Sequence, residues 1–114
     1  LDYIARYIPA NSYTYDWHDF NDLICIILKT IIEQGKGIEI NTAGLKYGMP
    51  EPNPCLDIVK IYHDLGGEII TVGSDAHEVK FFAYRFDVVA DMLKNAGFNY
   101  YTIFNERKPE FIRL

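Results

Sequence analysis

Residues 70–78 read ITVGSDAHE, and this stretch ends on two side chains that can bind a metal ion. The β-branched run at positions 70–72 predicts a strand that stops at Gly73. Asp75 and His77 follow two positions apart, so in extended backbone their side chains leave the chain on the same side. A carboxylate oxygen beside an imidazole nitrogen suits Zn, Mn or Fe.

A second interpretation of the same residues is a helix-capping turn. Asp75 is followed three positions later by Glu78, which fits a loose capping box and would leave His77 on the surface of a first helical turn. An isolated DxH is a weak motif, and a catalytic zinc site needs about three protein ligands. His18 and His63 are poor candidates for the others, because one lies in an aromatic loop and the other suits a helix end. Both interpretations stay open on spacing alone.

Another group of polar side chains follows a second expected strand, residues 38–41. Glu39, Asn41 and Thr42 lie at its end, and functional groups collect at the carboxyl ends of strands in parallel α/β proteins. If the two strands are neighbours, Glu39 lies near Asp75, either as a ligand or as a residue that orients one.

The elements around these residues alternate in type. Helical patterns cover residues 19–34, 53–65 and 82–96, and strand patterns cover residues 38–41, 68–72 and 99–104. Loops are expected over residues 10–18 and 45–52, and the tail is expected to form a short terminal strand. This order predicts an α/β fold with a parallel sheet and right-handed crossovers.

Two details of the helices are specific enough to check. Asn53 is expected to be an N-cap, with Pro54 in the first helical position. Phe82, Val89 and Leu93 belong to an apolar stripe that also includes Phe86, and this stripe is expected to face the strands.

Composition limits the classes of function. The chain has 114 residues, 49% of them hydrophobic, which fits one folded domain. A net charge of -5 without a basic cluster argues against a nucleic-acid partner. The longest apolar stretch, residues 23–28, is too short to span a membrane. Cys25 and Cys55 form no CxxC pair, and we expect reduced thiols in a cytoplasmic protein.

Two motifs at a defined separation carry a family resemblance. The segment IEINTAGLKYGMPEP, followed by GGEIITVGSDAH, resembles the C-terminal part of histidinol-phosphatases of the PHP (polymerase and histidinol phosphatase) superfamily. The similarity continues in LDYIARY at residues 1–7, in YRF at residues 84–86, in AGFNY at residues 96–100 and in RKP at residues 107–109. It therefore covers nearly the whole chain and favours the metal interpretation of Asp75 and His77.

The resemblance implies a fold and a metal centre. The family fold is a distorted (β/α)7 barrel, of which residues 1–114 would form the C-terminal portion of a single phosphoesterase domain. The complete site holds two or three divalent metals, and Asp75 and His77 match its last two ligands. The other ligands precede Leu1 in the family pattern, so we expect a longer parent enzyme and an isolated chain that is inactive. Exposed barrel edges would let this chain self-associate.

The implied activity is hydrolysis of L-histidinol phosphate in histidine biosynthesis, with a small phosphorylated substrate as the partner. Clustered metals would polarise the phosphoryl oxygens and supply the attacking hydroxide. Arg6 and Lys46 match phosphate contacts, although the family's EINTSGLR reads EINTAGLK here. Lys46 thus lacks the bidentate geometry of arginine, and both residues could be solvated basic side chains. Glu39, Asn41 and Thr42 would orient ligands or substrate.

Two other functions stay open. The parent could be another PHP phosphoesterase that acts on a different small phosphate or a nucleotide. It could also be a non-catalytic scaffold domain, like the inactive PHP modules attached to some polymerases.

Overall fold

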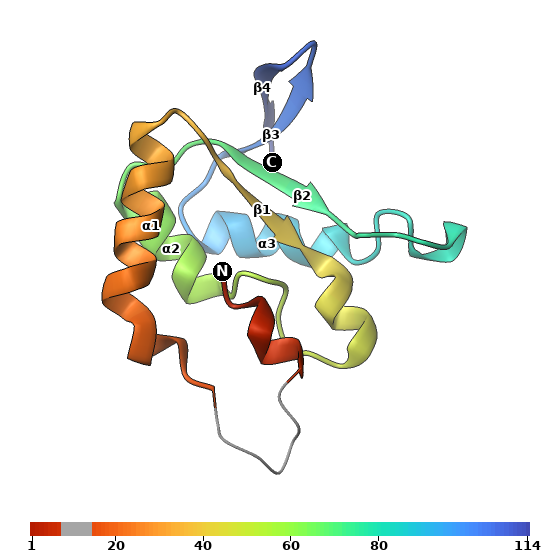
Figure 1. The fold of residues 1–114 in the computed structure, drawn as a ribbon. Helices are drawn as coiled ribbons and strands as arrows, with labels where there is room; N and C mark the ends of the chain where they lie inside the picture. The colour runs from red at the N-terminus through yellow and green to blue at the C-terminus, as the bar shows by residue number, and fades with distance from the viewer. Residues whose placement is uncertain (8–14) are drawn as a thin grey trace.

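The computed structural model describes residues 1–7 and 15–114, whose elements alternate largely as the sequence predicts (Figure 1). The α-helices are α1 (Asn21–Glu33), α2 (Leu56–Asp64) and α3 (Phe86–Asn95). The strands are β1 (Ile38–Asn41), β2 (Ile70–Gly73), β3 (Tyr100–Asn105) and β4 (Lys108–Arg113). Short 3-10 helices are η1 (Tyr3–Tyr7), η2 (Trp17–Phe20), η3 (Thr42–Tyr47) and η4 (Val79–Phe81).

The sheet that positions the candidate site is formed by β1 and β2. These strands pair in parallel, with Ile38 opposite Ile70 and Asn41 opposite Gly73 (Figure 1). Their carboxyl ends therefore lie at the same edge, as the αβ alternation predicts. Both motifs with chemically useful side chains, after β1 and after β2, meet at that edge.

The prediction that β3 would be a third parallel strand is wrong. β3 pairs with β4 as an antiparallel hairpin, with Tyr100 opposite Arg113 and Asn105 opposite Lys108. Glu106 and Arg107 both have positive φ, 48° and 67°, which is the backbone of a type I′ turn. The two-residue turn brings β4 directly back along β3, which accounts for the antiparallel pairing of this hairpin. The expected terminal strand is confirmed as β4.

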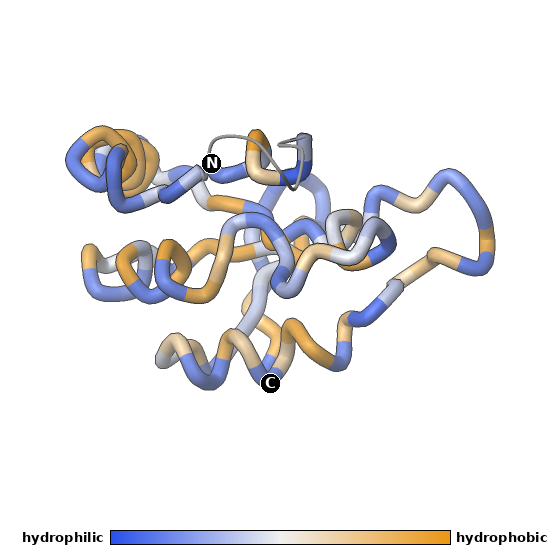
Figure 2. The backbone as a smooth tube through the Cα atoms, turned by 90° about the horizontal axis from the view of Figure 1, so that it is seen from below, coloured by the Kyte–Doolittle hydropathy of each residue, from blue (hydrophilic) through white to orange (hydrophobic). Residues whose placement is uncertain are grey.

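The apolar core lies between the helices and the parallel sheet. Each helix buries a stripe of aliphatic side chains, and Figure 2 shows hydrophobic and hydrophilic residues alternating along the helical turns. The fully buried members include Leu28, Ile58, Val59, Tyr62, Ile70 and Leu93. Within residues 1–7 and 15–114, no helix is long and apolar enough to cross a membrane.

The start of α2 differs from the prediction. Its N-cap is Cys55, not Asn53, and Pro54 precedes the helix. Asn53 is buried and forms a β-bridge with Asn41, whose N–H donates to the Asn53 carbonyl at 2.7 Å. The carboxylate of Asp2 also accepts a hydrogen bond from the Asn53 side chain. These partners are distant in sequence, so they override the local capping preference.

Two further expectations fail for local reasons. The helical stripe does not extend to Phe82, which is 81% exposed and precedes α3, because Ala83 and Arg85 have positive φ values of 52° and 57°. Phe86, at the start of α3, is also exposed, whereas Val89 and Leu93 are buried as predicted. The loop expected over residues 45–52 begins as the end of η3. The loop expected over residues 10–18 lies outside the described residues up to position 14, and η2 begins at position 17.

Candidate metal and phosphate site

The carboxyl end of β2 presents Asp75 and His77 together. The two side chains point toward each other, with 3.7 Å between Asp75 Oδ1 and His77 Nε2. Their side chains are 55% and 88% exposed, so both groups are available to a ligand from solution. The two side chains are close together, but not through the extended backbone that was expected, because Asp75 has a left-handed backbone with φ 47°.

The capping interpretation of Asp75 is wrong. Glu78 occupies the N-cap position of the following helix, η4, and Asp75 has a left-handed backbone with φ 47°. The chain contains a second DxH, Asp16 and His18, that does cap a helix: the His18 N–H donates to Asp16 Oδ1 at 2.9 Å at the start of η2. This backbone hydrogen bond, with the His18 side chain, lowers the pKa of Asp16. The same motif thus caps a helix at Asp16, whereas at Asp75 it caps none and leaves both side chains exposed and close to each other.

The Asp75–His77 pair fits one divalent cation as a partial donor set. Metal–ligand bonds of 2.0–2.1 Å in a tetrahedral site place two donor atoms about 3.3 Å apart. The observed 3.7 Å requires only a small side-chain adjustment. Among the residues that the structure describes, no group of three or more His, Cys, Asp or Glu side chains could enclose a metal ion. Two donors are fewer than the roughly three protein ligands of a catalytic zinc site.

Glu39 and Asn41 lie on the neighbouring strand at the same edge. The Asn41 side-chain amide donates to Glu39 Oε1 at 3.2 Å. A Cβ atom on Gly73 would lie 2.8 Å from the Glu39 carboxyl group, so this carboxylate covers the end of β2. The structure brings Glu39 to the sheet edge that carries Asp75, as expected from the strand order.

Asn41 and Thr42 have structural contacts that connect the two strand ends. Asn41 Oδ1 accepts the Ala43 N–H at 2.9 Å and so caps η3. The Thr42 hydroxyl donates to the Gly73 carbonyl at 3.4 Å, and Thr42 is fully buried. Thr42 therefore acts through the backbone of β2 and not through solvent.

Lys46 extends from η3 to the loop that carries Asp75 and His77. Its ammonium donates to the Ser74 carbonyl at 2.9 Å and to the Asp75 carbonyl at 3.1 Å. The same group lies 4.9 Å from the centre of the Phe81 ring. Lys46 is half-buried, so it is not a solvated surface lysine.

Arg6 lies in a cluster of tyrosines that sequence reasoning missed. Its guanidinium lies 4.0 Å from the centre of the Tyr47 ring and donates to the Tyr3 hydroxyl at 3.2 Å. A hydrogen bond with Tyr7 raises the pKa of the Tyr3 hydroxyl, and the negative charge of Asp75 adds to this effect. Tyr3 is thus within electrostatic reach of Asp75, which links η1 to the loop after β2. The adjacent letters KY at positions 46–47 were the only local signal for this cluster.

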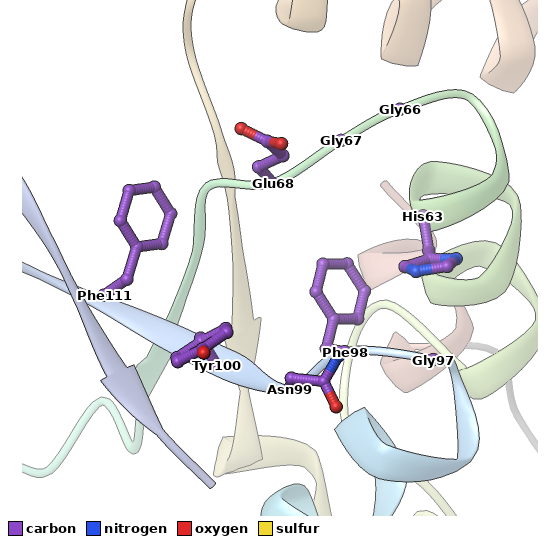
Figure 3. A pocket seen from close by; sticks show the side chains of 9 residues that line it. All are labelled: His63, Gly66, Gly67, Glu68, Gly97, Phe98, Asn99, Tyr100 and Phe111. Carbon is purple, nitrogen blue, oxygen red and sulfur yellow. The ribbon is translucent and has the colours of Figure 1, made fainter.

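A pocket elsewhere contains none of the predicted site residues. It has a volume of about 540 Å³ and lies near the start of β2, at the opposite end from Gly73 (Figure 3). Its walls are the end of α2, the loop before β2 and the hairpin, and the side chains of Phe98, Tyr100 and Phe111 line it (Figure 3). The Asp75–His77 pair is therefore separate from this cavity.

Curated relatives confirm the resemblance read from the sequence. The chain is 43% identical over 104 residues to a probable histidinol-phosphatase of Thermotoga maritima, covering 90% of this chain and 42% of the relative. A probable histidinol-phosphatase of Clostridium acetobutylicum is 32% identical over 97 residues, with 85% of this chain and 38% of the relative covered. A histidinol-phosphatase of Lactococcus lactis is 28% identical over 109 residues, covering 95% of this chain and 40% of the relative. The chain spans about two-fifths of the length of these relatives.

A solved structure has the same fold. The crystal structure of histidinol phosphate phosphatase from Lactococcus lactis, complexed with zinc, L-histidinol and phosphate, matches 96% of this chain and 41% of its own chain. The TM-score is 0.73 at 24% sequence identity. No protein-family model matches the chain. The chain is therefore similar to a fragment of a histidinol-phosphatase and shares its mixed α/β architecture with a parallel sheet.

Proposed function

We propose that this chain is the C-terminal portion of a metal-dependent phosphomonoesterase that hydrolyses L-histidinol phosphate to L-histidinol and phosphate. The observation that carries the proposal is the Asp75–His77 pair, with 3.7 Å between the donor atoms, at the carboxyl end of a parallel strand. This is where catalytic groups collect in parallel α/β folds. The similarity to histidinol-phosphatases supplies the reaction and the substrate.

The proposed setting of the pair is a distorted (β/α)7 barrel of a single phosphoesterase domain. β1 and β2 would be two neighbouring barrel strands, and the remaining strands would come from residues matching the part of the relatives that this chain does not cover. That part would also supply the missing metal ligands. The lack of a three-ligand cluster among residues 1–7 and 15–114 supports a site completed in this way.

Asp75 and His77 are proposed to hold zinc, manganese or iron as part of a centre with two or three ions. The zinc in the Lactococcus enzyme structure supports a divalent cation. When bound, such ions supply Lewis-acid polarisation of the phosphoryl oxygens and a nucleophile available at neutral pH. Glu39 is proposed to orient a ligand, since its carboxylate covers Gly73 one residue before the metal-binding loop.

Arg6 and Lys46 are proposed to neutralise the phosphate, and Asn41 and Thr42 to keep the strand ends in register. Stacking on Tyr47 and the bond to Tyr3 fix the plane of the Arg6 guanidinium. A fixed guanidinium plane favours bidentate binding of phosphate oxygens. Lys46 already uses two of its three N–H groups, which leaves one for a phosphate oxygen.

The proposal also predicts that the isolated chain self-associates. Exposed apolar side chains of the hairpin, such as Ile103, Phe104 and Phe111, together with unpaired strand edges, favour self-association.

We also propose a reducing, cytoplasmic compartment, which is consistent with the free thiols of Cys25 and Cys55.

Steady-state hydrolysis by the full-length protein tests the function. We expect kcat/KM for L-histidinol phosphate to exceed that for a nucleoside monophosphate and for glycerol phosphate by at least about 10²-fold, because a site that hydrogen-bonds its substrate rejects analogues lacking those groups. Arg6→Met should reduce kcat/KM by about 10²-fold through loss of a charge-stabilising contact. Preference for a nucleotide would support the alternative phosphoesterase, and no hydrolysis of any phosphomonoester would support the scaffold.

A further inference from the structure

The η3 helix provides hydrogen bonds to three consecutive backbone carbonyls at the end of β2. The Thr42 hydroxyl donates to Gly73 at 3.4 Å, and the Lys46 ammonium donates to Ser74 at 2.9 Å and to Asp75 at 3.1 Å. Carbonyls beyond the end of a strand have lost their ladder partners and need others or water. Here one short helix supplies those partners to the segment that leads directly into the metal-binding pair.

The segment that receives these bonds has a backbone that needs support. Asp75 has φ 47°, in the left-handed region that L-residues adopt at a cost. Its side chain and that of His77 are exposed, so apolar packing does not hold them in place. The carbonyl of Asp75 is itself one of the two acceptors of Lys46. The Lys46 contact therefore acts at the residue whose conformation orients the carboxylate.

The two residues of η3 that bind these carbonyls, Thr42 and Lys46, are themselves held in place. Asn41 caps η3 through the Ala43 N–H, and Thr42 is fully buried at the first position of the helix. The stem of Lys46 is half-buried and its ammonium lies against the Phe81 ring at 4.9 Å. A cation held between two carbonyls and an aromatic face has little freedom to follow a substrate.

We infer that Lys46 is a positioning residue that, together with Thr42, fixes the backbone of residues 73–75 and thereby sets the geometry of the Asp75–His77 pair. As far as it concerns bound metal, this inference rests on the proposed function. This role of Lys46 differs from phosphate neutralisation. It depends on the two N–H groups that bind the Ser74 and Asp75 carbonyls, whereas the third N–H group would bind phosphate. Residues that orient metal ligands typically change metal affinity by about 10–100-fold when they are replaced.

The two roles of Lys46 predict different kinetic changes. Loss of a phosphate contact raises KM and the inhibition constant of inorganic phosphate and leaves zinc affinity unchanged. Loss of a loop clamp lowers zinc affinity and kcat, because the ligand pair is no longer held in its binding geometry. Lys46→Met removes the ammonium and keeps the length of the side chain, and Thr42→Val removes only the hydroxyl.

Lys80 offers a matched control. Its ammonium also lies 4.9 Å from the Phe81 ring, on the same aromatic side chain, but its partner is the carboxylate of Glu78 at 2.8 Å. Lys80→Met therefore removes the same charge near the same ring without touching the carbonyls of residues 73–75.

Zinc affinity of the full-length protein, measured by competition with a chelator, is the first readout. We expect Lys46→Met to weaken zinc binding by about 10–100-fold, Thr42→Val to weaken it less, and Lys46→Arg to recover most of the loss because it retains N–H donors. Lys80→Met should stay within about twofold of the parent protein. A zinc affinity of Lys46→Met within twofold of the parent overturns the inference, whatever happens to phosphate inhibition.

Backbone order of the loop is the second readout, and it does not depend on the proposed function. In ¹⁵N relaxation of the metal-free protein, the order parameters of residues 74–77 should fall from about 0.85 to below about 0.6 in Lys46→Met and stay unchanged in Lys80→Met. Unchanged order in Lys46→Met overturns the clamp. If the parent protein neither binds zinc nor hydrolyses phosphate, the proposed function fails, and this measurement still decides whether Lys46 holds the loop.

Discussion

The carboxylate of Asp2 accepts a hydrogen bond from the backbone N–H of Cys55 at 2.8 Å, across 53 residues of sequence. Cys55 is the N-cap residue of α2, and the other oxygen of Asp2 accepts the Asn53 side-chain amide at 3.1 Å. A carboxylate at a helix N-terminus satisfies free N–H groups and the helix dipole together. This contact fixes the segment that carries Arg6 to α2, the helix that lies between β1 and β2 in the sequence.

Asp2→Ala should therefore destabilise the protein. Asp2 is only 4% exposed, and its loss leaves the half-buried Cys55 N–H without its acceptor and the buried Asn53 amide with only the Asp2 backbone carbonyl at 3.4 Å. We expect a loss of about 2–3 kcal/mol in the free energy of unfolding, measured by urea titration. Asp57→Ala is the control, because Asp57 lies in the first turn of the same helix but is exposed, and it should cost at most about 1 kcal/mol. Equal effects of the two substitutions would show that Asp2 does not act as a cap.

The apolar stripe of α3 predicts a contrast between two valines. Val89 is 1% exposed in the core and Val79 is 94% exposed in η4. Val89→Asp should cost several kcal/mol and abolish the cooperative thermal transition, because it buries an unpaired charge. Val79→Asp should change stability by at most about 0.5 kcal/mol. A soluble Val89→Asp protein with an unchanged melting temperature would contradict the assignment of this core.

Stability should decline at alkaline pH. Burial raises the pKa of the Cys55 thiol and of the Tyr62 hydroxyl above their unfolded values, near 8.5 and 10. The folded state then binds more protons than the unfolded state, so stability is retained below about pH 8.5 and lost as pH rises through the folded pKa values. Urea titrations from pH 7 to 11 measure the decline. Cys55→Ala should flatten it near pH 9, and an identical pH dependence in that variant would exclude Cys55 as a source.

Local patterns in the sequence predicted the elements that are stabilised locally. The helices α1 and α3, the buried positions Val89 and Leu93, and the strands that end at Asn41 and Gly73 lie where they were expected. The misassigned residues depend on distant or unusual contacts. Asn53 does not cap α2 because its side chain binds Asp2, 51 residues away in the sequence. The turn at Glu106 and Arg107 has positive φ values although it contains no glycine. Patterns within a few neighbouring residues do not predict such contacts.

The candidate site also combines features that local sequence predicts with features that depend on the fold. The residue types of Asp75 and His77 and their position after a strand are local properties, so the sequence could single them out, although their backbone is not the extended one that was expected. The contact from Lys46 to Ser74 joins residues 28 positions apart and depends on how η3 lies over β2. Residue types identified Lys46 as a basic group near the site, but only the fold shows that it faces backbone carbonyls.

Zinc binding by the full-length protein tests the central claim most directly. Asp16 and His18 form a second exposed Asp-x-His pair, so the double variants Asp75→Ala/His77→Ala and Asp16→Ala/His18→Ala are matched in composition and spacing. In calorimetric titration with Zn²⁺, we predict tight stoichiometric binding by the parent protein and by the Asp16/His18 variant. The Asp75/His77 variant should lose at least one equivalent of zinc together with hydrolysis of L-histidinol phosphate. Undiminished zinc stoichiometry and affinity in the Asp75/His77 variant would contradict the account and place the metal site elsewhere.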